Sequence, residues 1–311
     1  MKKLVAGIDI GGTNTVIGFV DGDGNCSFKT SIKTPGYEDP AVFVNEVAGI
    51  INNFFQEHQD VCLAGIGIGA PNGNFYNGSI EFAPNLKWKG IIPLVALFKK
   101  QFEVPVILTN DANAAAIGEM VYGNAKGMKH FIEITLGTGV GSGIVVDGNM
   151  VYGHDGFAGE IGHTIVYPGG RACGCGRNGC LEAYCSAKGI VKTYVELLEK
   201  NGQKAGAEIT PFTISALAGK GDSTALKTYE YTGEVLGLGL SNSVAHTSPE
   251  AIFLFGGIAN AGEMLFKPVR ESFEKNLLSI YKNKIKILPS GIKENDAAIL
   301  GAASLVWKNQ N

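Results

Sequence analysis

The feature that most constrains this chain is a stretch of sequence that occurs twice. Residues 6–22, AGIDIGGTNTVIGFVDG, align without a gap on residues 132–148, IEITLGTGVGSGIVVDG. Each copy has an apolar run typical of a strand, a glycine-rich turn and a second apolar run that ends at Asp-Gly. A repeat that occurs only twice does not indicate an array. We therefore predict two related lobes, each with a hairpin that has a glycine-rich tip.

Outside the two hairpins, strand-like runs alternate with segments of helical periodicity. Such alternation predicts an α/β fold. The expected strands are residues 104–109 and 251–255, and the expected helices include residues 40–56, 112–121, 182–201, 225–243 and 297–308.

The repeat also suggests where the chain divides. We predict a smaller N-terminal lobe of residues 1–118 plus 297–311 and a larger C-terminal lobe of residues 119–296 that carries a metal-binding loop. With 311 residues, of which 45% are hydrophobic, each lobe can bury a core of its own. A cleft between two lobes is the expected place for a ligand.

Charge and hydropathy restrict the partners. The net charge is -3, and no long run of Lys or Arg suggests binding to nucleic acid or to an anionic membrane. Asp9 interrupts the apolar start before a signal peptide can form, and the other apolar runs are too short to cross a bilayer. We expect a cytoplasmic protein with reduced cysteines that acts on small molecules.

Three glycine-rich turns follow apolar strands and suggest a phosphate site. In such turns backbone N–H groups can face phosphate oxygens, threonine hydroxyls add donors, and a carboxylate can hold a hydrated Mg²⁺. A single turn of this kind is usually only a tight turn, but three in one chain favour nucleotide binding. No P-loop motif and no G-x-G-x-x-G motif is present. The candidate residues are Asp9, Gly11, Gly12, Thr13, Thr138, Gly139, Gly256 and Gly257.

Asp111 lies between the expected strand 104–109 and an alanine-rich helix. A carboxylate at this place in an α/β sheet can accept the proton of an attacking hydroxyl, as phosphoryl transfer to an alcohol requires. Position alone favours a simpler role as the helix N-cap. Both roles remain open at this stage.

Cys173, Cys175 and Cys180, with His163 ten residues before the first of them, offer the donors of a closed tetrahedral zinc site. Because all four ligands would come from the protein, the metal would be structural. A disulfide or unrelated buried thiols are the alternatives, and Cys185 is a spare ligand candidate.

Two carboxylates flank this cysteine motif. If zinc fixes the loop, Glu160 and Glu182 can accept hydrogen bonds from sugar hydroxyls; otherwise they are solvated surface charges. Trp88 can flank a sugar, although core packing is the expected role.

The motifs together resemble those of the ROK family, the repressors, open reading frames and sugar kinases of the actin and hexokinase superfamily. The resemblance covers essentially the whole chain. It rests on DIGGT at residues 9–13, TNDANAAAIGE at 109–119, GTGVGSGIV at 137–145, GEIGH at 159–163 and CGCGRNGCLE at 173–182.

This resemblance implies a two-lobed, duplicated, ribonuclease H-like fold that closes on MgATP and a sugar. It implies that Asp111 is the catalytic base, that the glycine turns hold the ATP phosphates, and that Gly256 and Gly257 lie near the adenosine. His163 would bind zinc through one ring nitrogen and face the sugar with the other. Homodimers are usual in the family, and a tetramer is the alternative. The residues expected to bind the sugar are Asn85, Asn110, Asp111, Glu160, His163 and Glu182.

We therefore expect a hexose kinase that converts glucose to glucose 6-phosphate. Kinases of N-acetylglucosamine, N-acetylmannosamine or fructose are the alternatives, and a sugar-responsive regulator is the non-enzymatic one. Family repressors carry a DNA-binding winged helix ahead of this core, which we do not expect here because the first strand begins at Leu4. Many relatives have Lys where this chain has Asn14, so we assign that side chain no role.

Overall fold

The computed structural model describes residues 1–204, 206 and 209–308, and the chain divides into two compact units. Unit 1 comprises Met1–Met128, Met150–Ala158 and Ser290–Asn311, and unit 2 comprises Lys129–Asn149 and Gly159–Pro289. The lobe boundaries expected from the repeat stay a prediction. Residues 205 and 207–208 of the expected larger lobe and 309–311 of the smaller one lie outside the described residues.

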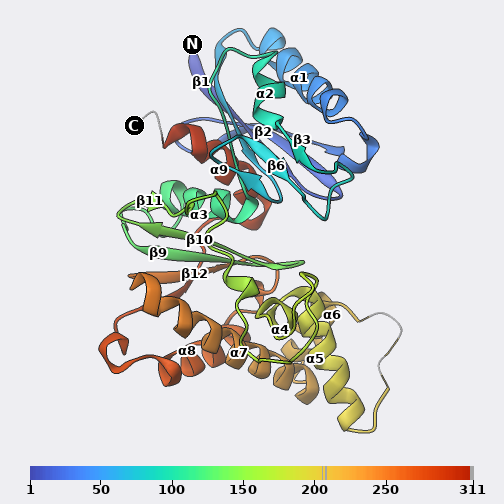
Figure 1. Cartoon of the computed structure of the whole chain (residues 1–311), viewed down its shortest axis with the longest axis vertical. Coiled ribbons are helices and arrows are strands. Elements are labelled where there is room, and N and C mark those ends of the chain that lie inside the picture. The colour runs from blue at the N-terminus through green and yellow to red at the C-terminus, as the bar shows by residue number, and fades with distance from the viewer. Residues whose placement is uncertain (205, 207–208, 309–311) are drawn as a thin grey trace. The chain divides into compact units, whose positions relative to one another are not determined.

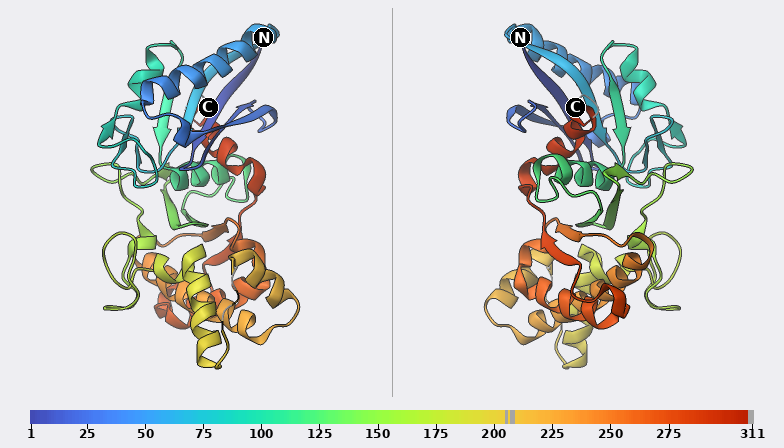
Figure 2. Two further views of the ribbon diagram at one scale, coloured as in Figure 1. Left: turned by 90° about the vertical axis from the view of Figure 1, so that its right-hand side faces the viewer. Right: turned by 90° about the vertical axis from the view of Figure 1, so that its left-hand side faces the viewer.

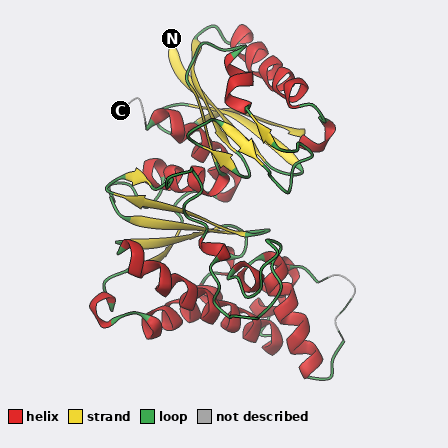
Figure 3. Ribbon diagram, viewed as in Figure 1, coloured by secondary structure: helices red, strands yellow, loops and turns green. Residues whose placement is uncertain are grey.

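Unit 1 is built on a five-stranded sheet with the strand order β3-β2-β1-β4-β8. The hairpin β1–β2 is antiparallel, whereas β1, β4 and β8 run parallel to one another. Figure 1 labels many of the elements, including β1, β2 and β3, and Figure 3 separates helices from strands by colour. The strands are β1 (Lys2–Ile10), β2 (Asn14–Val20), β3 (Cys26–Lys33), β4 (Val61–Gly69) and β8 (Val106–Thr109); the helices are α1 (Pro40–Glu57), α2 (Leu94–Lys99), α3 (Asp111–Tyr122) and α9 (Glu294–Trp307).

The two faces of this sheet bury different helices. Leu4 and Ile8 of β1 pack in the core that includes α1, which lies along the sheet in the views of Figure 2. Val5, which points to the other face, packs against Ile299 of α9. Gly67 of β4 permits this close approach, because a Cβ there would collide with the backbone of α9.

Unit 2 repeats the same sheet. Its strand order is β11-β10-β9-β12-β13, in which β9–β10 is an antiparallel hairpin and β9, β12 and β13 run parallel. Each strand therefore has a counterpart in unit 1, which confirms the duplication predicted from the repeat. The strands are β9 (Phe131–Leu136), β10 (Val140–Val146), β11 (Asn149–Met150), β12 (Ala251–Phe255) and β13 (Lys286–Pro289).

Helices of unit 2 bury one large core against this sheet. The helix predicted over residues 182–201 is interrupted: Ser186 caps a new helix by accepting a hydrogen bond from the Gly189 backbone N–H at 3.3 Å. The helices are α4 (Glu182–Cys185), α5 (Ala187–Lys200), α6 (Pro211–Gly219), α7 (Ser223–Thr247) and α8 (Glu263–Asn276).

A small three-stranded sheet, which the sequence patterns did not indicate, lies in unit 1 and joins β5 (Gly73–Asn74), β6 (Ser79–Glu81) and β7 (Ile91–Ile92). Trp88, just before β7, is buried and donates its indole N–H to the Tyr37 carbonyl at 3.0 Å, which confirms core packing. Among the residues that the structure describes, no helix has the length and apolar character needed to cross a membrane.

Candidate functional site

The carboxyl ends of three parallel strands of unit 1 bring the acidic candidates together. In the strand register Asp9 of β1 is opposite Gly69 of β4, and Gly69 is opposite Thr109 of β8. A Cβ on Gly69 would lie 3.7 Å from the Asp9 Oδ1 and 3.7 Å from the Asp111 Cα. Asp9 and Asp111 therefore flank the same glycine at the edge where open α/β sheets bind ligands.

The surroundings of these two carboxyl groups raise both pKa values. Burial, and secondly the charge of Asp111, raises the pKa of Asp9 to about 7. Solvent reaches Asp111, but the protein atoms around it still remove part of its hydration and raise the pKa of its carboxyl group. Two carboxylates with raised pKa values suit proton transfer or the binding of a cation.

The helix cap that follows β8 is Asn110 and not Asp111. The Asn110 Oδ1 accepts a hydrogen bond from the Asn113 backbone N–H at 2.6 Å. Asp111 is the first helical residue, and its Oδ1 accepts from the Ala112 N–H at 2.9 Å. The capping role that position alone favoured for Asp111 is thus filled by its neighbour.

The first glycine turn lies beside Asn85 in unit 1. The Gly11 N–H donates to the Asn14 carbonyl at 2.9 Å, which closes the turn, and Thr13 is exposed. A Cβ on Gly12 would lie 2.7 Å from the Asn85 carbonyl oxygen. This contact opens into a cavity of about 620 Å³ lined by Gly12, Thr34, Pro35, Glu38, Pro84, Asn85, Leu86, Lys87, Trp88 and Lys89.

The second glycine turn, in unit 2, lies against a carboxylate from the cysteine loop. Thr138 at its tip is exposed, and the Glu182 Oε2 accepts a hydrogen bond from the Val140 N–H at 3.0 Å. A Cβ on Gly139 would lie 2.6 Å from the same oxygen. The other oxygen, Oε1, lies 3.7 Å from the Cys173 Sγ. Glu182 thus joins this turn to the cysteine motif.

The third turn follows β12, the parallel neighbour of β9. Gly256 has a φ of +103°, and a Cβ there would lie 2.5 Å from the Leu136 carbonyl oxygen at the end of β9. Both observations require glycine at this position. Gly257 follows and is exposed.

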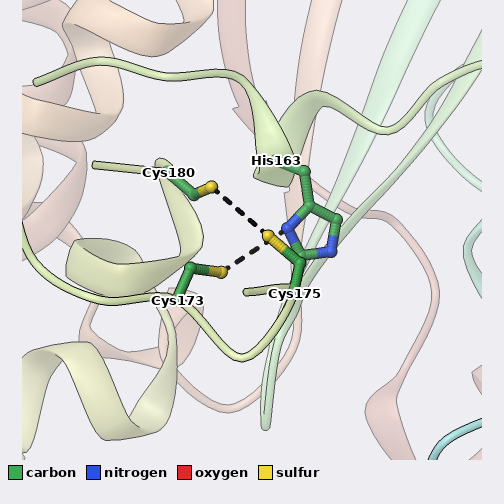
Figure 4. Close-up of side chains that lie close together, drawn as sticks. All are labelled: His163, Cys173, Cys175 and Cys180. Carbon is green, nitrogen blue, oxygen red and sulfur yellow. Dashed lines mark hydrogen bonds between the residues drawn. The ribbon is translucent and has the colours of Figure 1, made fainter. Parts of the chain in front are cut away.

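The four predicted zinc ligands of unit 2 converge, as Figure 4 shows. Their donor atoms all lie within 4.8 Å of one another. The Cys173 Sγ is 3.7 Å from the His163 Nδ1, and the Cys175 Sγ is 3.7 Å from the Cys180 Sγ. Tetrahedral zinc with Zn–S bonds of about 2.3 Å requires edges of about 3.7 Å between its ligand atoms. The donor set therefore fits zinc, and no disulfide joins these cysteines in the structure.

Arg177 supplies positive charge beside this cluster. Its backbone and side-chain hydrogen bonds lower the pKa of Cys175 to about 6, whereas burial raises the pKa of Cys173 and of Cys180. The Arg177 guanidinium also donates to the His163 carbonyl at 2.7 Å. Zn²⁺ with three thiolates and one imidazole has a net charge of -1, which this arginine would balance.

Two outcomes differ from what the sequence suggested. Cys185, the spare ligand candidate, is wrong as a ligand: it is buried in the core with its Sγ 3.7 Å from the Thr232 carbonyl. Arg171, which the motif analysis missed, fastens the loop by donating to the Thr193 hydroxyl at 2.9 Å and pairing with Glu196 at 2.5 Å. A lone arginine beside the motif gave no signal for this role.

Comparison with known proteins establishes the family. The sequence profile described as the ROK family matches residues 5–309. The chain belongs to the ROK family. This ROK protein is 35% identical over 322 residues to a glucokinase of Halalkalibacterium halodurans, a match that covers 99% of this chain and 96% of the relative.

Other relatives include a solved kinase and a repressor. The structure of a ROK family glucokinase from Streptomyces griseus, in complex with glucose and AMPPNP, matches with a TM-score of 0.80 at 31% identity and covers 97% of this chain and 98% of that one. A xylose repressor of Bacillus spizizenii is 34% identical over 244 residues, which is 78% of this chain and 61% of the repressor. The ROK protein thus has the duplicated actin and hexokinase-like α/β fold that was expected.

Proposed function

We propose that this ROK protein transfers the γ-phosphoryl group of ATP to O6 of a hexose, and that glucose, which becomes glucose 6-phosphate, is the preferred one. The convergence of Asp9 and Asp111 at Gly69 carries the proposal. The similarity to relatives named glucokinase over nearly the whole chain supports it. The complex of the Streptomyces griseus glucokinase with glucose and AMPPNP supports both substrates.

In this reaction Asp111 is the general base. Its carboxylate accepts the proton of the O6 hydroxyl while O6 attacks the γ-phosphorus; the new O–P bond forms as the bond to the bridging oxygen of ADP breaks. A raised pKa makes Asp111 a stronger base than an ordinary carboxylate. The Asn110 Oδ1 already accepts a hydrogen bond in the helix cap, so the Nδ2 of this residue is the group that would donate to a sugar hydroxyl.

We assign Asp9 and the glycine turns to the binding of the ATP phosphates and their Mg²⁺ ion. When bound with ATP, Mg²⁺ neutralises charge on the transferred phosphoryl group. Asp9 would hold a water of that ion. The backbone N–H groups of Gly12, Thr13, Thr138 and Gly139 and the hydroxyls of Thr13 and Thr138 would donate to phosphate oxygens, and Gly11, whose N–H closes the first turn, would shape it. Gly256 and Gly257 would lie beside the adenosine of the bound ATP.

We also propose that His163, Cys173, Cys175 and Cys180 hold a structural zinc ion. The metal would hold the loop in place. Because all four of its ligands come from the protein, it would have no open coordination position for catalysis. With Nδ1 toward the thiolates, the His163 ring keeps Nε2 for a sugar hydroxyl. Glu160 and Glu182 would join it as acceptors, and Asn85 would also bind the sugar.

The decisive test is a coupled assay of ADP formation with Mg²⁺ and a panel of glucose, N-acetylglucosamine, N-acetylmannosamine, mannose, fructose and allose. Asp111→Asn should retain sugar binding and lose about 10²- to 10⁴-fold in kcat. Asp60→Asn, which changes an exposed carboxylate outside the site, is the matched control. A near-normal kcat in Asp111→Asn would contradict the assignment of Asp111 as the base. If an N-acetylhexosamine or fructose were turned over faster than glucose, that sugar would be the substrate in place of glucose.

The similarity to the xylose repressor favours a second candidate, a sugar-responsive regulator without catalysis. Tight binding of a sugar without turnover, together with binding to DNA at physiological salt, would support it. ATP turnover with any sugar of the panel would exclude it as the sole function.

We place the kinase in the cytoplasm, where its thiols stay reduced, and propose a homodimer as its assembly. Light scattering on the purified chain distinguishes the dimer from a monomer or a tetramer.

A further inference from the structure

One polar side chain is buried in the alanine-rich start of α3. Asn113 lies in the first turn of this helix, two residues after Asp111, and residues 112–116 read Ala-Asn-Ala-Ala-Ala. Stability alone favours alanine at such a position, because alanine has the higher helix propensity and buries no polar group. The Asn113 side chain has no role in the reaction proposed above.

The amide of Asn113 bonds across the turn that carries the base. Its Nδ2 donates to the Thr109 Oγ1 at 3.3 Å, and Thr109 is fully buried at the end of β8. The Thr109 carbonyl accepts from the Ala70 N–H at 3.0 Å, directly after β4. Thr109 therefore belongs to the hydrogen-bonded end of the sheet, and the amide joins the start of α3 to it.

Asp111 lies between the two residues that this bond joins. Thr109 is two residues before it, and Asn113 is two residues after it. The Asp111 Oδ1 accepts from the Ala112 N–H at 2.9 Å, so the same helical turn orients the carboxylate. A movement of this turn relative to β8 therefore moves the carboxylate.

The other amide atom indicates that the side chain does not serve stability. The Asn113 Oδ1 is buried and accepts no hydrogen bond from any residue that the structure describes. A buried acceptor without a donor lowers the stability of the folded chain. A side chain that is buried at such a cost is typical of a functional site.

We propose that Asn113 is a positioning residue for Asp111: its Nδ2 holds the first turn of α3 against Thr109 and so fixes where the carboxylate lies. The inference rests on the proposed kinase activity for its kinetic consequence, while its structural part stands on the contacts alone. A displacement of about 1 Å at a reacting group can cost about 10²-fold in rate, so one buried hydrogen bond suffices to matter.

Asn113→Ala tests the proposal. It removes the amide but keeps the backbone N–H that donates to the Asn110 Oδ1, so the helix cap stays intact. We expect kcat to fall about 10-fold and the KM for hexose to change by less than about 2-fold. The urea midpoint should stay close to that of the wild type, because the variant also removes the buried Oδ1 and introduces the better helix former. A role in packing alone would lower the midpoint and leave kcat unchanged.

Ser304→Ala is the matched control for the loss of a buried hydrogen bond in unit 1. The Ser304 hydroxyl is fully buried and donates to the Leu300 carbonyl of its own helix, α9, at 2.6 Å. This variant should keep kcat within about 2-fold of the wild type.

Two variants of Thr109 alter the same contact from the other side. Thr109→Val removes the hydroxyl at nearly constant shape and should lower kcat about 10-fold, whereas Thr109→Ser keeps the hydroxyl and should stay within about 2-fold of the wild type. The double variant of Asn113→Ala and Thr109→Val should be no slower than the slower single variant, because both changes break one contact. Near-normal kcat in Asn113→Ala, equal losses in Thr109→Ser and Thr109→Val, or losses that multiply in the double variant would overturn the proposal.

Amide hydrogen exchange over residues 110–114 separates this inference from the proposed function. Asn113→Ala and Thr109→Val should each raise exchange there about 10-fold, and Ser304→Ala should not. If the wild type phosphorylates no sugar of the panel, the kinase proposal fails, while exchange still decides whether Asn113 holds the turn. Unchanged exchange in Asn113→Ala overturns the positioning role whatever the activity.

Discussion

Burial of the Asp9 carboxyl group in the site lowers the stability of the folded chain at neutral pH. Its pKa is raised from 3.8 to about 7, so between these pH values the unfolded chain releases a proton that the folded chain keeps. The free energy of unfolding therefore falls as the pH rises through this window. The side chain of Asp9→Asn does not titrate. From pH 5 to pH 8 the free energy of unfolding of this variant should therefore rise by about 1 kcal/mol relative to that of the wild type, after allowance for partial screening by solvent.

Urea unfolding of the wild type and Asp9→Asn at both pH values measures this difference, with Asp60→Asn as the exposed control. A stability difference that is the same at pH 5 and pH 8 contradicts the raised pKa. The same variant should lose MgATP turnover, since an amide does not replace the carboxylate toward a hydrated cation. Stability gained together with activity lost is what a functional carboxylate predicts.

We expect the cysteine loop, which residues 163–180 form, to depend on the proposed zinc ion for a fixed shape. Arg171 is hydrogen-bonded to Thr193 and Cys180 is buried, but the segment between Cys173 and Cys180 has glycine at three positions, which leaves its backbone free to adopt many conformations. Cys173→Ser should reduce zinc to well below one ion per chain. It should also lower the free energy of unfolding by roughly 2–5 kcal/mol, because the ligand set is incomplete.

Metal analysis and thermal unfolding of the purified variants check this prediction. Cys26→Ser changes an exposed thiol outside the cluster and should keep one zinc per chain. A wild type that carries no zinc after purification without chelators, together with unchanged stability in Cys173→Ser, would show that the four donors serve no metal.

Elements with a repeated or periodic sequence could be predicted, and those defined by one contact could not. Both hairpins and the alternation of strands and helices follow from apolar runs and glycine turns. The break at Ser186 depends on a single side-chain cap inside a continuous apolar pattern, so the periodicity of the sequence gave no sign of it. The two-residue strand β5 was too short to give any periodic signal.

The same distinction holds for the candidate site. His163 and the cysteines are close in sequence, and their spacing alone suggested the cluster that the structure brings together. The hydrogen bond from the Val140 N–H to the Glu182 carboxylate joins residues 42 positions apart that lie in two separate motifs, so only the fold reveals it. Residues that connect distant segments are the part of a site that one sequence conceals.

At the scale of the whole molecule, the chain first leaves unit 1 after Met128 and enters it for the last time at Ser290, and the buried carboxylate of Glu119 binds backbone near both points. Glu119 accepts from the Asn124 N–H at 2.6 Å, from the Ser290 hydroxyl at 2.5 Å and from the Gly291 N–H at 2.9 Å. Glu119→Ala leaves these donors without an acceptor and should cost about 3–5 kcal/mol of unfolding free energy. Glu119→Gln, which keeps one oxygen, should cost less, and Glu271→Ala on an exposed helix face almost nothing. Urea unfolding measures all three, and equal losses in Glu119→Ala and Glu271→Ala would mean that water replaces the carboxylate at no cost.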